Sequence, residues 1–136
     1  MSVTVTWDNH ERTVLRYEFA GAWLWEDFRK ALDQAEKMLA SVGHIVDVIA
    51  DFEASGCVPT ETLARLAYVA GNRPVNLGSN VIVGSKVFNT TTFTVFGNYY
   101  GDVARAYQMA HSLDRARALL AKTTLQYVPS EHFLSA

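Results

Sequence analysis

The sequence predicts an α/β sandwich, in which a mixed sheet of about five strands starts with an N-terminal hairpin and carries about four helices. Two patterns predict this class. Near the start of the chain, apolar and polar residues alternate, which is typical of half-buried strands. Farther along, short apolar runs alternate with segments whose apolar residues recur at helical spacing. Such an order indicates parallel strands joined by crossover helices.

Length and composition favour a single domain, which we expect over residues 1–122, followed by a tail over residues 123–136. The chain has 136 residues, 49% hydrophobic and 19% charged, with a formal net charge of -2. This balance excludes a disordered protein, and because no basic run appears we expect no nucleic-acid partner. The single Cys57, the short apolar runs and the polar start predict a cytoplasmic protein without a membrane span.

The first third of the chain predicts a hairpin and a helix. Residues 2–7 and 14–19 alternate with the period of a strand, and a polar turn over residues 8–12 joins them. Over residues 24–39 the apolar residues fall three and four apart, with charged residues opposite them, which predicts an amphipathic helix.

The middle of the chain predicts two more strands around a helix. Residues 45–51 are a nearly continuous apolar run rich in branched side chains, which is typical of a central strand covered on both faces. Pro59 suits the first turn of a second helix, whose apolar positions continue to residue 70 and stop at Gly71. Residues 81–84 predict a short buried strand.

Residues 88–100 favour a strand by their Thr and Phe content and a helix by the spacing of their aromatic residues. A parallel neighbouring strand needs a crossover of about a dozen residues, so we predict a third helix there. Residues 106–110 then form the last strand, and Ser112 caps a final helix over residues 113–120.

Three stretches lie in or next to the predicted strands: GAWLWED at residues 21–27, VDVIADF at 46–52 and SLDRARALL at 112–120. In this order they resemble STAS domains, the fold of sulfate transporters and anti-sigma-factor antagonists, and more closely the SpoIIAA-like proteins. Together with the strand order, the resemblance extends over residues 2–121. It implies a non-enzymatic bacterial domain that regulates or binds another protein.

The resemblance also implies a phosphorylation position. In anti-sigma-factor antagonists, a serine in an Asp-Ser-Ser-Gly-Leu motif opens the helix after the central strand, and a kinase modifies it. The matching stretch here is Pro59, Thr60, Glu61, Thr62 and Leu63, in which Thr60 takes the place of the serine. The aspartate, the second serine and the glycine are replaced, and the Glu61 carboxylate would oppose a phosphate. Thr60 is therefore either a phospho-switch or an ordinary first-turn threonine.

The central strand carries two carboxylates on one face, Asp47 and Asp51. They are four residues apart, too distant for a close acid/base pair. Asp51 ends the strand, where ligands of α/β proteins usually bind. The alternative is that the Asp51 side chain caps the following turn, as aspartate side chains often do by bonding a nearby backbone N–H.

A second group of candidate residues is aromatic and lies within the predicted third helix. Such a stripe usually belongs to the core, and the alternatives are a self-association face or an apolar ligand pocket. Residues 62–101 contain no acidic residue and only three basic ones, a depletion typical of interface centres. We therefore predict a homodimer, with a partner or ligand face formed by Phe88, Phe93, Phe96, Tyr99 and Tyr100 together with Asp51.

Motifs for catalysis or metal binding are missing from the sequence. The four histidines have no metal-ligand spacing, no GxSxG motif occurs, and the glycines of residues 78–86 do not match a phosphate loop. We predict no catalytic residue, no metal and no cofactor. The expected function is a STAS-like regulatory or protein-interaction domain; the alternative is a carrier for a small apolar or lipid-like ligand, since the fold is similar to lipid-binding CRAL-TRIO domains.

Overall fold

The computed structural model describes residues 2–56, 76–84 and 107–121 of the chain. A second helix follows the last strand over residues 113–121. The other elements, in chain order, are β1 (Ser2–Trp7), β2 (Val14–Ala20), α1 (Trp25–Ala40), β3 (Val46–Asp51), β4 (Leu77–Val83) and β5 (Tyr107–Ala110).

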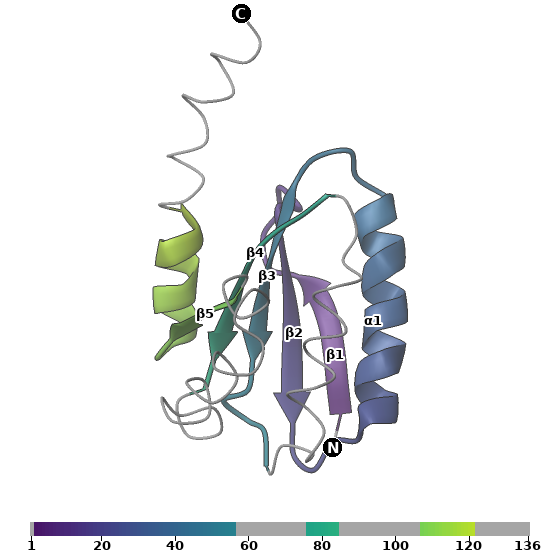
Figure 1. The fold of residues 1–136 in the computed structure, drawn as a ribbon, viewed down its shortest axis with the longest axis vertical. Coiled ribbons are helices and arrows are strands. Elements are labelled where there is room, and N and C mark those ends of the chain that lie inside the picture. Colours follow the sequence, from purple (N-terminus) through teal and green to yellow (C-terminus); the bar gives the residue numbers. More distant parts are fainter. Residues whose placement is uncertain (1, 57–75, 85–106, 122–136) are drawn as a thin grey trace, which may run out of the picture.

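The five strands form one sheet in the order β1-β2-β3-β4-β5 (Figure 1). β1 and β2 are an antiparallel hairpin, and each later strand is parallel to its neighbour. The predicted five-stranded mixed sheet with an N-terminal hairpin is thus confirmed. The described residues contain two helices in place of the predicted four, and the helices predicted over residues 59–70 and 88–100 lie outside the described ranges.

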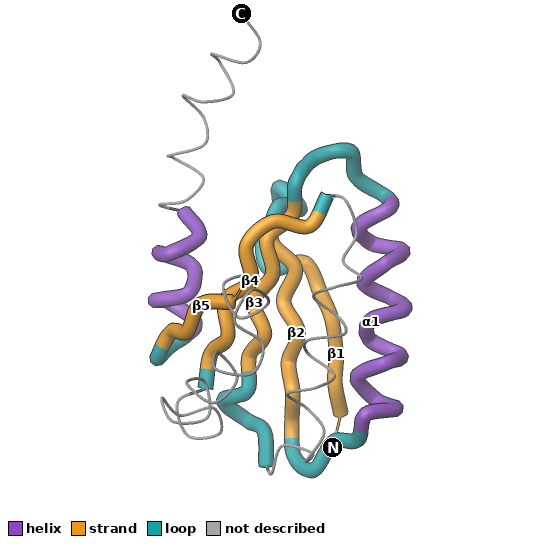
Figure 2. Tube along the Cα trace, viewed as in Figure 1, coloured by secondary structure: helices purple, strands orange, loops and turns teal. Residues whose placement is uncertain are grey.

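The two helices cover opposite faces of the sheet (Figure 2). Alternate residues of β3 pack on opposite faces of the sheet, because successive side chains of a strand point in opposite directions. Val46 and Val48 belong to the apolar cluster under α1, whereas Ile49 belongs to the cluster under the 113–121 helix, which includes Ala116 and Leu120.

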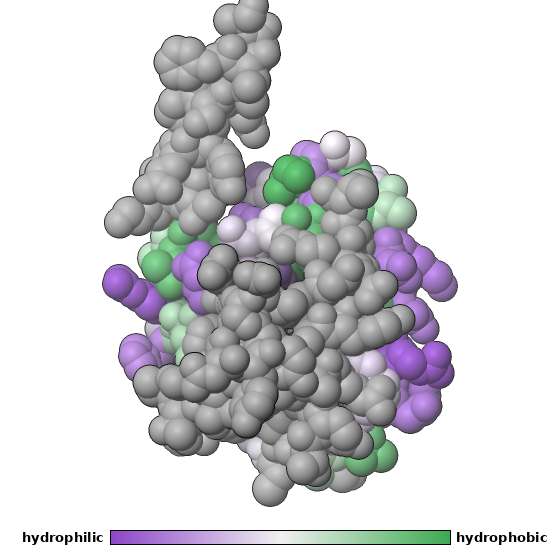
Figure 3. All heavy atoms as spheres, viewed as in Figure 1, coloured by the Kyte–Doolittle hydropathy of each residue, from purple (hydrophilic) through white to green (hydrophobic). Residues whose placement is uncertain are grey.

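Aromatic rings dominate the cluster under α1. Phe19 of β2 is 1% exposed and stacks on Phe52, with ring centroids 4.1 Å apart. Phe28 of α1 meets Phe19 and Tyr17 edge-on, at 5.2 Å and 5.7 Å. The regular apolar spacing predicted for this helix therefore buries one face against the sheet. Its opposite side is hydrophilic (Figure 3).

β4 begins at Leu77, four residues before the predicted start at residue 81, so the prediction was too short. The register slips between Val46 and Val48, where β4 carries one extra residue. The Asp47 carboxylate fills this irregularity, because its Oδ1 accepts a hydrogen bond from the Ser79 backbone N–H at 2.8 Å. Gly78 leaves room for this carboxylate, since a Cβ at position 78 would have to displace Asp47 Oδ1.

The helix ends agree with local chemistry. Asp27 Oδ2 accepts the Leu24 backbone N–H at 2.8 Å before α1. The predicted cap of the last helix is confirmed, because Ser112 Oγ accepts the Arg115 N–H at 3.1 Å. None of the described helices combines the length and the apolar character needed to cross a membrane.

Candidate functional site

Asp51 lies at the carboxyl end of β3, as predicted, and its side chain caps the local turn. Its Oδ1 accepts a hydrogen bond from the Glu53 backbone N–H at 2.9 Å. This bond is the turn cap considered for Asp51, and the role of Asp51 in a partner or ligand face stays a prediction. The loop that follows bends toward the turn after β2, where Gly21 and Ser55 form an isolated parallel bridge.

The other predicted site residues lie outside the described residues. This applies to Thr60 and to the five aromatic residues predicted to form a partner or ligand face: Phe88, Phe93, Phe96, Tyr99 and Tyr100. The phospho-switch, the aromatic face and the alternative of an apolar-ligand carrier therefore stay predictions.

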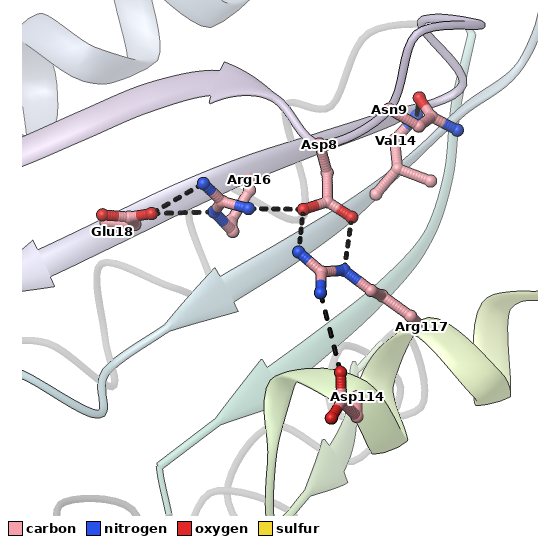
Figure 4. A network of polar contacts seen from close by, with 7 residues as sticks. All are labelled: Asp8, Asn9, Val14, Arg16, Glu18, Asp114 and Arg117. Atoms are coloured by element: carbon pink, nitrogen blue, oxygen red, sulfur yellow. Dashed lines mark hydrogen bonds and ion pairs between the residues drawn. The ribbon is translucent and has the colours of Figure 1, made fainter.

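A network of ion pairs lies on the sheet face opposite α1 (Figure 4). Its centre is Asp8, which follows β1 and whose side chain is only 4% exposed. Arg117 of the last helix binds Asp8 with two hydrogen bonds, from Nε to Oδ2 at 2.9 Å and from Nη2 to Oδ1 at 2.8 Å. Arg16 of β2 donates to the same carboxylate and binds Glu18 Oε1 through its Nε at 2.9 Å.

The electrostatics of Asp8 follow from these contacts. Burial alone would raise the pKa of Asp8, but the hydrogen bonds and positive charges of Arg117 and Arg16 outweigh it and lower the pKa. The Asp8 hydrogen bond in turn raises the pKa of Arg117. Asp8 is therefore held as a carboxylate, and it joins the hairpin to the last helix across the sheet.

Asp47 lies on the same face and differs from Asp8, because no guanidinium binds it among the described residues. Burial raises the pKa of Asp47, and the hydrogen bond from Ser79 opposes this only in part. Its carboxylate supports the irregular start of β4.

The Asp8 network was missed by sequence reasoning, which placed Asp8 only in a polar turn. Arg117 is 109 residues away, and no local spacing connects the two. A weak signal was present, because Arg16 is opposite Thr6 in the predicted hairpin, and Asp8, two residues farther along the same face, is its diagonal neighbour.

The arrangement suits a structural role and an exposed polar surface. Asp8 and Asp51 are each bonded to groups of the chain itself. Across the described ranges, no group of three or more His, Cys, Asp or Glu side chains could hold a metal ion. On the hairpin, the side of the sheet opposite α1 presents exposed Thr4, Thr6 and Glu18.

Comparison of the chain with protein-family models, with curated proteins and with solved structures finds no match.

Proposed function

We propose that the chain is a non-enzymatic, STAS-like regulatory domain of the SpoIIAA-like type, which acts by binding another protein. The order of elements supports this: a hairpin, a helix, three parallel strands and a last helix on the opposite face. The engaged acidic groups support it as well, since Asp8 and Asp51 hold structure together through hydrogen bonds.

The observation that carries the proposal is the polar hairpin face. Residues Val5 and Trp7 point toward α1 and belong to its apolar cluster or pack against it. Their neighbours Thr4 and Thr6 point the other way and are exposed, together with Glu18 of β2. This face is built from rigid strands and offers hydroxyl and carboxylate groups to a partner.

The test is binding with variants of this face. Partners are captured from a lysate of the source organism, identified by mass spectrometry, purified and measured by calorimetry. A Thr4→Arg/Thr6→Arg variant should weaken binding at least tenfold, because two bulky charges replace small hydroxyls in the interface. A matched control, Glu36→Arg on the exposed side of α1, should bind as the unmodified protein does. The proposal would be contradicted if the hairpin variant bound the partner as tightly as the unmodified protein does. It would also be contradicted if none of the captured proteins bound the chain once purified.

Two further expectations belong to this proposal. The homodimer predicts twice the chain mass by light scattering at micromolar concentration, and a monomeric mass would contradict it. The Thr60 switch predicts phosphate on Thr60 in cells, and repeated peptide coverage of Thr60 without phosphate would end it.

A further inference from the structure

Two segments that are distant in sequence are bonded together just beyond β2 and β3. Gly21 donates its N–H to the Ala54 carbonyl at 2.9 Å, and its own carbonyl accepts the Gly56 N–H at 2.8 Å. A side-chain bond joins the same two segments, because the Trp23 indole N–H donates to Ser55 Oγ at 2.8 Å. The loop after β3 is thus tied to the turn that leads into α1.

Glycines make this approach possible. Gly21 has a φ of 64°, in the left-handed region that favours glycine. A Cβ on Gly56 would lie 3.2 Å from the Gly21 carbonyl oxygen, closer than ordinary van der Waals contact. The two backbones therefore meet at a distance that a side chain at position 56 would disturb.

The contacts between the turn after β2 and the loop after β3 form a junction, and Trp23 connects this junction to α1. It is 2% exposed, although its indole N–H reaches the loop. Its ring lies 6.2 Å from Phe28 in the first turns of α1 and 6.1 Å from Phe52 at the start of the loop. One rigid side chain thus contacts the loop by a hydrogen bond and the helix by ring packing.

We infer that the loop over residues 52–56 and the first turn of α1 open and close as one cooperative unit, whose closed form is stabilised by the Trp23–Ser55 hydrogen bond. The reason is that the loop cannot move away without leaving the buried indole N–H unbonded, which is costly unless Trp23 moves too. Moving Trp23 disturbs its packing on Phe28.

The junction would carry a signal from the loop to the helix. The loop leads from the end of β3 toward Thr60, so an event there would reach α1 through Trp23. This use of the junction rests on the proposed function. The coupling itself does not, because it is a property of the free protein.

The test is native-state amide hydrogen exchange on the full chain. Ser55→Ala removes the acceptor of the indole bond. We expect the Gly21 and Gly56 amides to exchange roughly fivefold faster, the equivalent of one lost hydrogen bond. The same increase is expected in the first turn of α1, where the Asp27 and Phe28 amides both donate to the Leu24 carbonyl.

Ser41→Ala is the matched control. It also removes one serine hydrogen bond, from Ser41 Oγ to the Met38 carbonyl at 2.6 Å, but at the far end of α1. It should leave the Asp27 amide unchanged. The amide of Ala116, in the other helix, should be unaffected by either substitution.

Three results would overturn the inference. The first is faster exchange in Ser55→Ala at Gly21 and Gly56 only, which would mean that the loop opens alone. The second is no change at any of these amides. The third is equal acceleration at Ala116, which would mean that the whole domain was destabilised. None of these results bears on the hairpin variants, which test partner binding separately.

Discussion

The two faces of the sheet are held to their helices by different interactions. Under α1, aromatic rings from β2, the helix and the loop after β3 pack in direct contact, with Phe19 and Phe52 stacked. Under the 113–121 helix, the apolar cluster of the described residues is smaller and is formed by aliphatic side chains. Beside that cluster the face is polar, and Asp8 binds Arg117 of the helix.

The difference shows that one sheet can hold one helix by apolar burial and another helix by apolar burial together with ion pairs. Apolar burial is strong and does not require exact orientation, so it suits α1, whose apolar side packs along the sheet. Ion pairs with two aligned hydrogen bonds add little net stability per charge, but they are directional. The Asp8–Arg117 pair therefore helps to set where the 113–121 helix lies relative to the hairpin.

The largest expected effect is on the α1 face. Phe19→Ala should lower the free energy of unfolding by about 3–5 kcal/mol, because it removes a buried ring and leaves a cavity among its neighbours. Urea unfolding measures the change. Leu24→Ala, at a side chain that is 65% exposed, should change it by less than about 0.5 kcal/mol. A loss for Phe19→Ala no larger than the control's would contradict the aromatic core described above.

The next effect tests the ion-pair face. Asp8→Ala should lower the free energy of unfolding by about 1.5–3 kcal/mol, because it removes hydrogen bonds between charged groups. Arg117→Ala should cost less, since Asp8 keeps Arg16 and the Arg117 side chain is 43% exposed. The double variant should cost less than the sum of the two single losses, because they share one interaction. Strict additivity in urea unfolding would mean that the pair does not hold the helix.

A smaller effect concerns the irregular start of β4. Gly78→Ala should lower the free energy of unfolding by about 1–2 kcal/mol, because the added methyl group displaces the Asp47 carboxylate. Gly43→Ala is the control, since a Cβ there meets no atom within 4 Å. Thermal unfolding distinguishes the two. Equal melting temperatures would show that the carboxylate moves aside without cost.

The smallest effects are those of pH, and they have opposite signs for the two aspartates. The pKa of Asp8 is lowered on folding, so its stabilisation is present above its unfolded pKa of about 3.9 and is lost as pH falls through the folded value. The pKa of Asp47 is raised, so its stabilisation is present below about 3.9 and is lost as pH rises through the folded value.

Two asparagine variants check these signs by urea unfolding at several pH values between about 3 and 7. The advantage of the unmodified protein over Asp8→Asn should grow with pH. Its advantage over Asp47→Asn should shrink with pH over the same range. Parallel slopes for the two variants would show that the two carboxylates do not differ in environment.

Local pattern was enough to predict much of the fold. The strand period of residues 2–7 predicted β1 with its observed bounds, and the helical period predicted α1 to within one residue at each end. The Ser112 cap was predicted from residue type alone and is confirmed. These predictions are confirmed because each feature depends only on residues within one helical turn or one strand.

The candidate site depended on contacts that no local pattern encodes. For Asp51 the sequence left a ligand group and a turn cap open, and only the folded loop shows that its carboxylate accepts the Glu53 N–H. The start of β4 was missed because the Asp47 carboxylate, more than thirty residues away, completes the strand by bonding Ser79.

The sequence by itself determined the order of the five described strands, the N-terminal hairpin and the places of α1 and the 113–121 helix, because the period of apolar residues reports which side of each element is buried. Only the tertiary structure decided which polar groups meet. Asp8 in an apparent turn became the buried centre of the Arg16 and Arg117 network, and Trp23 joined the loop after β3 to α1. The physical reason is separation along the chain. Periodicity is fixed by residues close in sequence, whereas ion pairs and hydrogen bonds between elements form only where the folded chain brings their polar groups together.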